Sequence, residues 1–133
     1  MRKRIIYMTL ALAALTSCRY DVDEVLLQRS DISLTEKGKL QMSFDEKTCQ
    51  LGYNQDRNEF RVYDDKIANW FTITCNAYPS SIGQEVTADI EYTTSDDTKS
   101  YSGLTFTVEK TSSDGLIWLW CKDKKIGIVI KAL

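Results

Sequence analysis

The side chains that could carry chemistry are four cysteines, three tryptophans and 19 acidic residues, in a chain that has no histidine. Because histidine is a common general base and metal ligand, its absence argues against catalysis and against a zinc site. No stretch matches a phosphate-binding glycine loop, a nucleophile elbow or a helix-loop-helix calcium loop. A small hydrolase built on two carboxylates is a remote alternative. We expect a protein that is not an enzyme and that holds neither metal nor cofactor.

Cys18 ends an N-terminal segment with the composition of an export signal. Residues 2–4 are basic, and residues 5–15 form an apolar run interrupted only by Thr9. As a helix this run would span about 16 Å, well short of the ~30 Å hydrocarbon core, so a membrane-spanning anchor is not expected. The closing Leu15-Thr16-Ser17-Cys18 resembles the lipobox of bacterial lipoproteins.

The lipobox resemblance implies that residues 1–17 are a signal peptide that is removed. Cys18 would become the first residue, with a diacylglycerol on its sulfur and an acylated amine, and would anchor the protein in the outer membrane of the cell envelope. Several acyl chains on one residue would hold the protein durably, whereas a single chain binds membranes only marginally. The alternative is an ordinary secretory signal, but it would place Leu15 where a small residue is preferred.

Residues 18–30 are expected to form the lipidated cysteine and a flexible tether, in which Asp21, Asp23 and Glu24 are solvated. An acidic cluster after the lipidated cysteine is similar to the signals that send Bacteroidota lipoproteins to the cell surface. A plain solvated linker is an equal alternative. Residues 25–27 could instead form an edge strand.

The remaining chain is small and acidic. Without residues 1–17 it has 116 residues, enough for one domain, with 14 basic against 19 acidic side chains. This balance argues against a nucleic-acid partner and against attraction to anionic lipid, so the membrane contact is expected to come from the lipid on Cys18.

From residue 31 onward, apolar and polar residues alternate with the period of two that is typical of strands. The longest example sets Val86, Ala88, Ile90 and Tyr92 against polar neighbours. The pattern repeats in eight or nine short segments and includes no helix of three turns. Without helices to cover a sheet, its apolar face must be buried either by a second sheet stacked on the first or by closure of the sheet into a barrel. We predict an all-β fold, an antiparallel immunoglobulin-like β-sandwich, over residues 31–133.

Three cysteines remain in this domain, so one thiol stays unpaired even if a disulfide forms. Cys49, Cys75 and Cys121 each fall in phase with apolar neighbours, which predicts small buried side chains. A structural disulfide between two of them is the alternative, and an envelope location would permit it.

Trp118 and Trp120 share one face of the predicted strand 116–121, whose opposite face is also apolar. Either this strand is central and covered on both faces, or the two tryptophans form a ligand-binding face. Exposed aromatic rings commonly contact ligands, and indoles stack on sugar rings. Trp118 and Trp120 are therefore the candidate binding residues.

Trp70 opens a strand that is followed by the Gly-containing loop 80–83, the alternating strand 86–92 and two closing strands. This arrangement loosely resembles the BACON domains of Bacteroidota surface proteins, which are immunoglobulin-like. The resemblance covers roughly residues 30–131, but an Asn and an Arg around the loop and a Gln in the last strand are missing. It implies contact with glycan or mucin, or a spacer role, and assigns no binding residue.

Two functions remain open. The first is a surface-anchored, non-catalytic module that binds carbohydrate or protein. The second is an accessory lipoprotein that docks onto another envelope protein through a sheet edge or its last hairpin.

Overall fold

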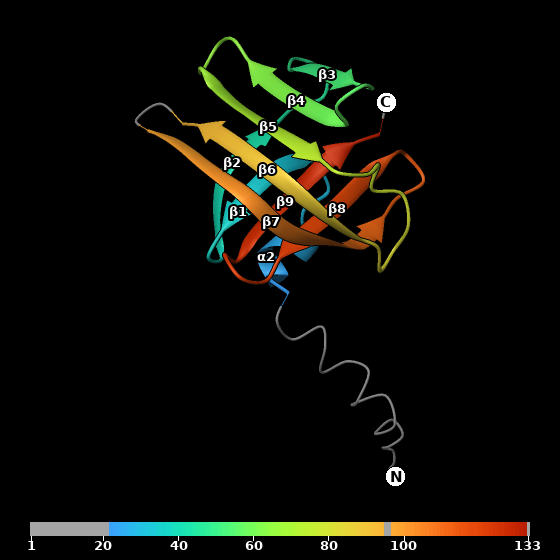
Figure 1. Cartoon of the computed structure of the whole chain (residues 1–133). Helices are drawn as coiled ribbons and strands as arrows, with labels where there is room; N and C mark the ends of the chain where they lie inside the picture. The colour runs from blue at the N-terminus through green and yellow to red at the C-terminus, as the bar shows by residue number, and fades with distance from the viewer. Residues whose placement is uncertain (1–21, 95–96, 133) are drawn as a thin grey trace.

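The computed structural model of the chain describes residues 22–94 and 97–132 (Figure 1). The predicted signal peptide and Cys18 lie outside these residues. The described elements are α2 (Glu24–Leu27), β1 (Ile32–Glu36), β2 (Lys39–Phe44), β3 (Gln50–Asn54), β4 (Glu59–Asp64), β5 (Asn69–Cys75), β6 (Glu85–Thr93), β7 (Thr98–Thr111), β8 (Leu116–Cys121) and β9 (Ile126–Lys131).

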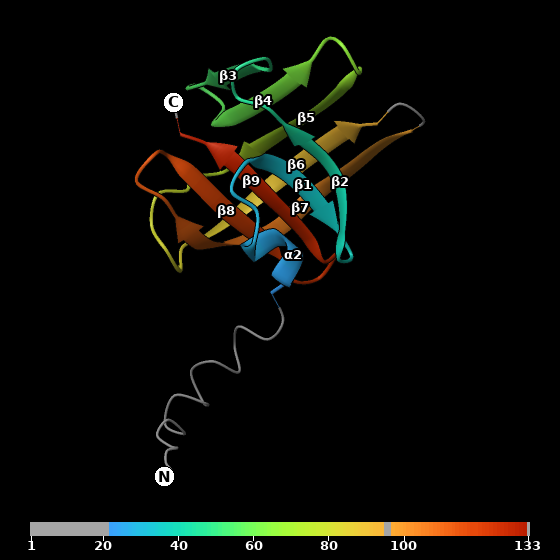
Figure 2. The ribbon, with the colours of Figure 1, turned by 180° about the vertical axis from the view of Figure 1, so that it is seen from behind.

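The nine strands of the described chain form one antiparallel sheet with the order β2-β1-β9-β8-β7-β6-β5-β4-β3. From β3 to β9 each strand pairs with the next one along the chain, and the β1–β2 hairpin then adds to β9. The sheet curls, so that its two halves face each other (Figures 1 and 2). The prediction of an all-β antiparallel sandwich of eight or nine short strands is confirmed. Its two layers belong to a single continuous sheet.

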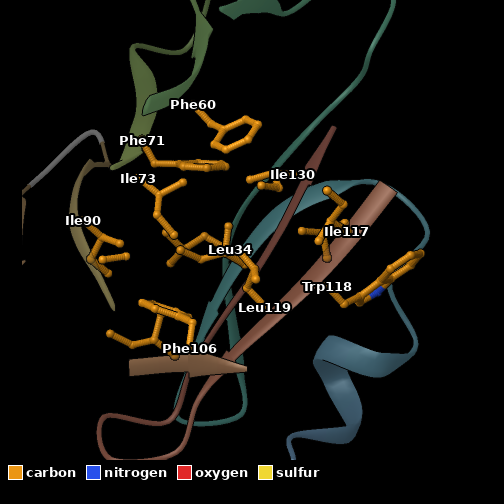
Figure 3. Packing of buried hydrophobic residues seen from close by; sticks show 14 of the residues in the cluster. Leu34, Phe60, Phe71, Ile73, Ile90, Phe106, Ile117, Trp118, Leu119 and Ile130 are labelled. Carbon is orange, nitrogen blue, oxygen red and sulfur yellow. The ribbon is translucent and has the colours of Figure 1, made fainter. Parts of the chain in front are cut away.

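The core lies between the facing halves of the sheet. Phe44 of β2 and Phe71 of β5 are far apart in the strand order, yet their ring centroids are 5.8 Å apart. Inward-facing residues of β6 are buried and alternate with exposed ones, as the sequence pattern predicts. Figure 3 shows side chains from β4–β7 meeting those from β1, β8 and β9, among them Phe60, Phe71, Ile73, Ile90, Phe106, Leu34, Leu119 and Ile130.

A second buried layer lies on the outside of the sheet, where α2 covers β8, β9 and β1 (Figure 2). The side chain of Asp23 caps α2 by accepting the N–H of Val25 at 2.9 Å. Leu26 is fully buried, above Gly127 of β9. A Cβ atom at Gly127 would lie 2.7 Å from Leu26 Cδ2, so only glycine at this position lets the leucine approach the sheet.

The prediction of a flexible tether is therefore wrong for residues 22–29, and the alternative of an edge strand at residues 25–27 is wrong as well. Val22 and Leu26 are buried, and the segment between them begins a helical turn instead of a strand. We call residues 22–29 the N-terminal strap. The folded domain begins at least as early as residue 22, because burial of these apolar side chains offsets the cost of ordering the strap.

Replacement of Leu26 by alanine tests whether the strap is part of the fold. We expect Leu26→Ala to lower the free energy of unfolding by about 3 kcal/mol, the typical cost of truncating a buried leucine. Leu40→Ala is the matched control, because Leu40 is 41% exposed; its cost should stay below about 1 kcal/mol. Urea denaturation of both variants measures the difference, and equally small costs would mean that the strap is loose.

Candidate functional site

Trp118 and Trp120, the predicted binding residues, are only 2% and 4% exposed. They lie on the outer face of β8, and Trp118 donates its Nε1–H to the carbonyl oxygen of Arg29 in the strap at 3.1 Å. Figure 3 shows the Trp118 ring beside α2. The Nζ atom of Lys110 lies 4.5 Å from the centre of the Trp118 ring.

Of the two alternatives for β8, the structure shows the central strand that is covered on both faces. All six of its residues are buried, and β7 and β9 pair with it on either side. The prediction that Trp118 and Trp120 form an exposed face is therefore corrected, because Arg29 of the strap and Lys110 lie against Trp118 and the Trp120 side chain is buried as well. A ligand could stack on them only if the strap moved away.

Cys49, Cys75 and Cys121 carry free thiols. Cys75 and Cys121 are buried and Cys49 is half-buried, so the prediction of small buried side chains is confirmed for the first two. Burial raises the pKa of Cys75 to about 12. This thiol stays protonated at physiological pH, and a protonated, buried thiol is a poor nucleophile.

Glu36, at the end of β1, connects the two halves of the sheet. Its carboxylate accepts the hydroxyl hydrogens of Tyr92 and Tyr101, the latter at 3.1 Å, and lies 3.6 Å from Lys99 Nζ. Burial opposes ionisation of this carboxyl, but the hydrogen bonds and the lysine charge outweigh it, so the pKa of Glu36 is lowered. The pKa of Tyr92 is raised by burial and by the carboxylate. The ionised Glu36 carboxylate therefore joins the two halves of the sheet across the core.

The outer face of β3, β4, β5 and the adjoining part of β6 is open and slightly concave. Cross-strand register places its side chains in two neighbouring rows. A hollow of about 520 Å³ lies over them, within the range of small-molecule sites. We call this surface the Tyr63–Trp70 face; it comprises Gln50, Gly52, Arg61, Tyr63, Trp70, Thr72 and Glu91.

Two aromatic rings stand side by side on this face. Tyr63 of β4 is the direct cross-strand partner of Trp70 of β5. Tyr63 is 42% exposed and Trp70 is half-buried. The Tyr63 hydroxyl donates to Asp65, which raises the pKa of Tyr63, and Asp65 also accepts a hydrogen bond from Gln50 Nε2 at 3.5 Å. These contacts restrain the tyrosine ring at the rim of the hollow.

Gly52 leaves the floor of the hollow without a side chain. Its φ is not positive, and a Cβ atom built on it would make an ordinary 3.8 Å contact with Arg61 Cβ. Neither the backbone nor the packing therefore demands glycine here, in contrast to Gly127. The effect of glycine at this position is to keep the space next to Arg61 open.

The charges on this face nearly balance. Glu59 also lines the hollow and is largely buried, with Arg61 Nε 3.4 Å and Arg57 Nη2 3.9 Å from its carboxylate oxygens. Glu91 adds a second, exposed carboxylate from β6. A strongly anionic ligand would find one arginine that is already paired with an acid, so the face suits an uncharged ligand.

The chemistry available on the Tyr63–Trp70 face is stacking and hydrogen bonding. Aromatic rings present apolar faces to a ligand, while the amide, guanidinium, hydroxyl and carboxylate groups around them can bind its hydroxyls. Among the described residues, no group of three or more Cys, Asp or Glu side chains could hold a metal ion. No helix of the described chain is long and apolar enough to cross a membrane.

Comparison of the chain with known protein families finds no match, and neither the curated proteins nor the solved structures contain a match. The resemblance to BACON domains and the lipobox thus remain predictions that rest on the residues quoted for them.

The sequence analysis placed the candidate face at two tryptophans that are buried, although a signal for the outward position of Trp70 was present. Phe71, Ile73 and Cys75 alternate as inward residues, which places Trp70 on the outward face of the same strand. The same phase places Tyr63 outward, opposite Val62. What the sequence did not reveal is that these two rings are cross-strand partners, since this depends on the register of β4 against β5.

The pH dependence of stability tests the role of Glu36. Because its folded-state pKa is lowered from 4.5, its contribution is present above the unfolded-state value and is lost as the pH falls through the folded-state value. We expect Glu36→Gln to cost about 2 kcal/mol of unfolding free energy at pH 7. The difference from wild type should shrink below about pH 4.5.

Urea denaturation at pH 7 and at pH 3 measures both differences. Glu85→Gln, at an exposed position of β6, is the matched control and should change stability little at either pH. A cost of Glu36→Gln that is the same at both pH values would contradict this role.

Proposed function

We propose that this protein is a lipid-anchored envelope protein whose β-domain binds carbohydrate without catalysis. The lipid is carried by Cys18, and the carbohydrate contacts the Tyr63–Trp70 face. The observation that supports the binding site is a pair of accessible aromatic rings at the rim of an open hollow whose floor is a glycine that the fold does not require.

The ligand that suits this face is a neutral sugar chain. Tyr63 and Trp70 offer apolar ring faces for the C–H groups of a sugar ring, and their neighbours offer donors and acceptors for its hydroxyls. Adjacent strands lie about 4.8 Å apart, so rings on neighbouring strands form one continuous platform. Because the hollow is open to solvent, it can bind a sugar unit within a glycan chain as well as one at the end of the glycan.

The position of the site relative to the anchor fits a surface module. In both ribbon views the β3–β4 hairpin lies at the opposite end of the molecule from α2, where the described chain begins (Figures 1 and 2). A lipid on Cys18, four residues before Val22, would leave the Tyr63–Trp70 face directed away from the bilayer.

Filling the hollow tests the carbohydrate site. Gly52→Thr should lower affinity for a neutral glycan at least tenfold, because a side chain would occupy the space next to Arg61. Threonine suits strands, so stability should be unchanged or improved. A glycan array of residues 19–133 identifies the ligand, and calorimetry then compares the variants.

Ile67→Ala is the control for this experiment, since Ile67 is 50% exposed in the β4–β5 turn and does not line the hollow. It should bind like the wild type. Equal binding by Gly52→Thr and wild type would contradict the site, and the absence of any neutral glycan among the ligands would contradict the function.

Metabolic labelling tests the anchor. Cells given radiolabelled palmitate should incorporate it into the wild-type protein, and Cys18→Ser should abolish the incorporation because serine lacks the thiol that forms the thioether. Cys49→Ser, which removes a half-buried thiol of the domain, is the control and should label normally. Labelling that persists in Cys18→Ser would refute the lipobox.

A second candidate function is docking onto another envelope protein through a sheet edge. The last hairpin, β8–β9, cannot supply this edge because β7 and β1 pair with its two sides. The edge strand β3 carries no charged residue and no proline, the usual protections of an open edge. Cross-linking in cells that captures one constant partner, with no glycan bound, would favour this function.

A further inference from the structure

The net negative charge of the chain conceals a local concentration of lysines. The β1–β2 and β8–β9 turns lie side by side, because the backbone N–H of Lys37 donates to the carbonyl oxygen of Lys125 at 2.8 Å. Both residues have positive φ. The pair of turns and the residues next to them carry five exposed lysines, namely Lys37, Lys39, Lys122, Lys124 and Lys125. We call this surface the lysine end.

The lysine end adjoins the start of the strap. A Cβ atom at Gly38, in the β1–β2 turn, would lie 4.0 Å from Asp23 Oδ2, so the turn and the strap are in close proximity. Figure 2 shows α2 beside both turns. Val22 is the first described residue, and the four Cα-to-Cα steps from Cys18 to Val22 span at most about 14 Å when fully extended.

The lysines outnumber the acids at this end. Asp123 lies in the β8–β9 turn, and Asp23 and Glu24 lie in the strap. Glu36 is already engaged by Tyr92, Tyr101 and Lys99. Within the described part of the chain, no ion pair engages Lys37, Lys39, Lys124 or Lys125. Their charges are available to a partner.

We infer that the lysine end rests against the anionic headgroups of the bilayer that holds the lipid anchor. This inference rests on the proposed lipidation of Cys18 in one respect, because the lipid would make the bilayer the surface that lies within reach of the lysine end. The partner follows from charge complementarity and from the short connection to the anchor. Each lysine near an anionic membrane strengthens binding roughly fivefold, and the effect decays within a Debye length of about 10 Å.

This contact gives the domain a fixed orientation instead of free rotation on a tether. The strap is packed on the sheet, and the lysines next to it attract the same surface that the lipid enters. The Tyr63–Trp70 face, on the opposite side from α2, is then held toward the exterior (Figure 1).

Binding of vesicles by residues 19–133 tests the inference without the lipid. This fragment keeps α2 and all the described strands, and circular dichroism checks that it is folded. In 20 mM NaCl we expect at least tenfold more protein on phosphatidylcholine vesicles that contain 30% phosphatidylglycerol than on phosphatidylcholine alone. In 0.5 M NaCl the preference should disappear. Because the fragment lacks Cys18, the result is independent of the palmitate labelling.

Two matched double variants locate the contact. Lys37→Asn with Lys125→Asn removes two charges from the lysine end, and asparagine tolerates the positive φ of both positions. Lys47→Gln with Lys66→Gln removes two exposed charges elsewhere. The first pair should lower vesicle binding at least tenfold and the second less than threefold. Equal losses, or no preference of the wild-type fragment for anionic vesicles, would overturn the inference.

Discussion

The packing of Leu26 above Gly127 determines which parts of the sheet are covered and which remain open. Because β9 has no side chain at this position, the strap can lie directly on the outer face of β8, β9 and β1. These three strands are then buried on both faces. The strap also covers Trp118, and the carbonyl oxygen of Arg29 in the strap accepts the indole N–H of this tryptophan. The outer face of β3–β5 receives no such cover from the described chain.

This division gives the two ends of the molecule different properties. The strap and the lysine end lie together, where the chain leaves the domain toward Cys18. The Tyr63–Trp70 face lies on β3–β5, at the far end of the molecule from α2 (Figures 1 and 2). The open hollow lies over the outer side of these strands. The proposed attachment at one end and the proposed recognition at the other would both depend on this arrangement of the curled sheet.

Period-two alternation was sufficient to predict the strands and the inward-facing residues, because it reflects only which face of a strand is buried. Because both faces of β8 are apolar, one of the two alternatives predicted for it was a central strand that is covered on both faces. The structure shows this arrangement. The strap could not be predicted in this way. Its four-residue helix has an Asp23 cap, but a helix this short also needs the packing of Leu26 on Gly127, about 100 positions away.

The candidate site and the lysine end were missed for the same reason. Tyr63 and Trp70 become neighbours through strand register, and Lys37 and Lys125 through the pairing of β1 with β9. A net charge summed along the chain cannot reveal that lysines from two distant turns gather at one end. Long-range pairing, which local patterns do not specify, produces both surfaces.

The most direct test of this account is hydroxyl-radical footprinting of the folded protein, read residue by residue by mass spectrometry. We expect Tyr63 and Trp70 to be oxidised rapidly, and Trp118 and Trp120 to be oxidised much more slowly because the strap and the sheet shield them. A neutral glycan should protect Tyr63 and Trp70 alone. Rapid oxidation of Trp118 and Trp120 in the folded protein would contradict the division of the sheet into a covered and an open outer face.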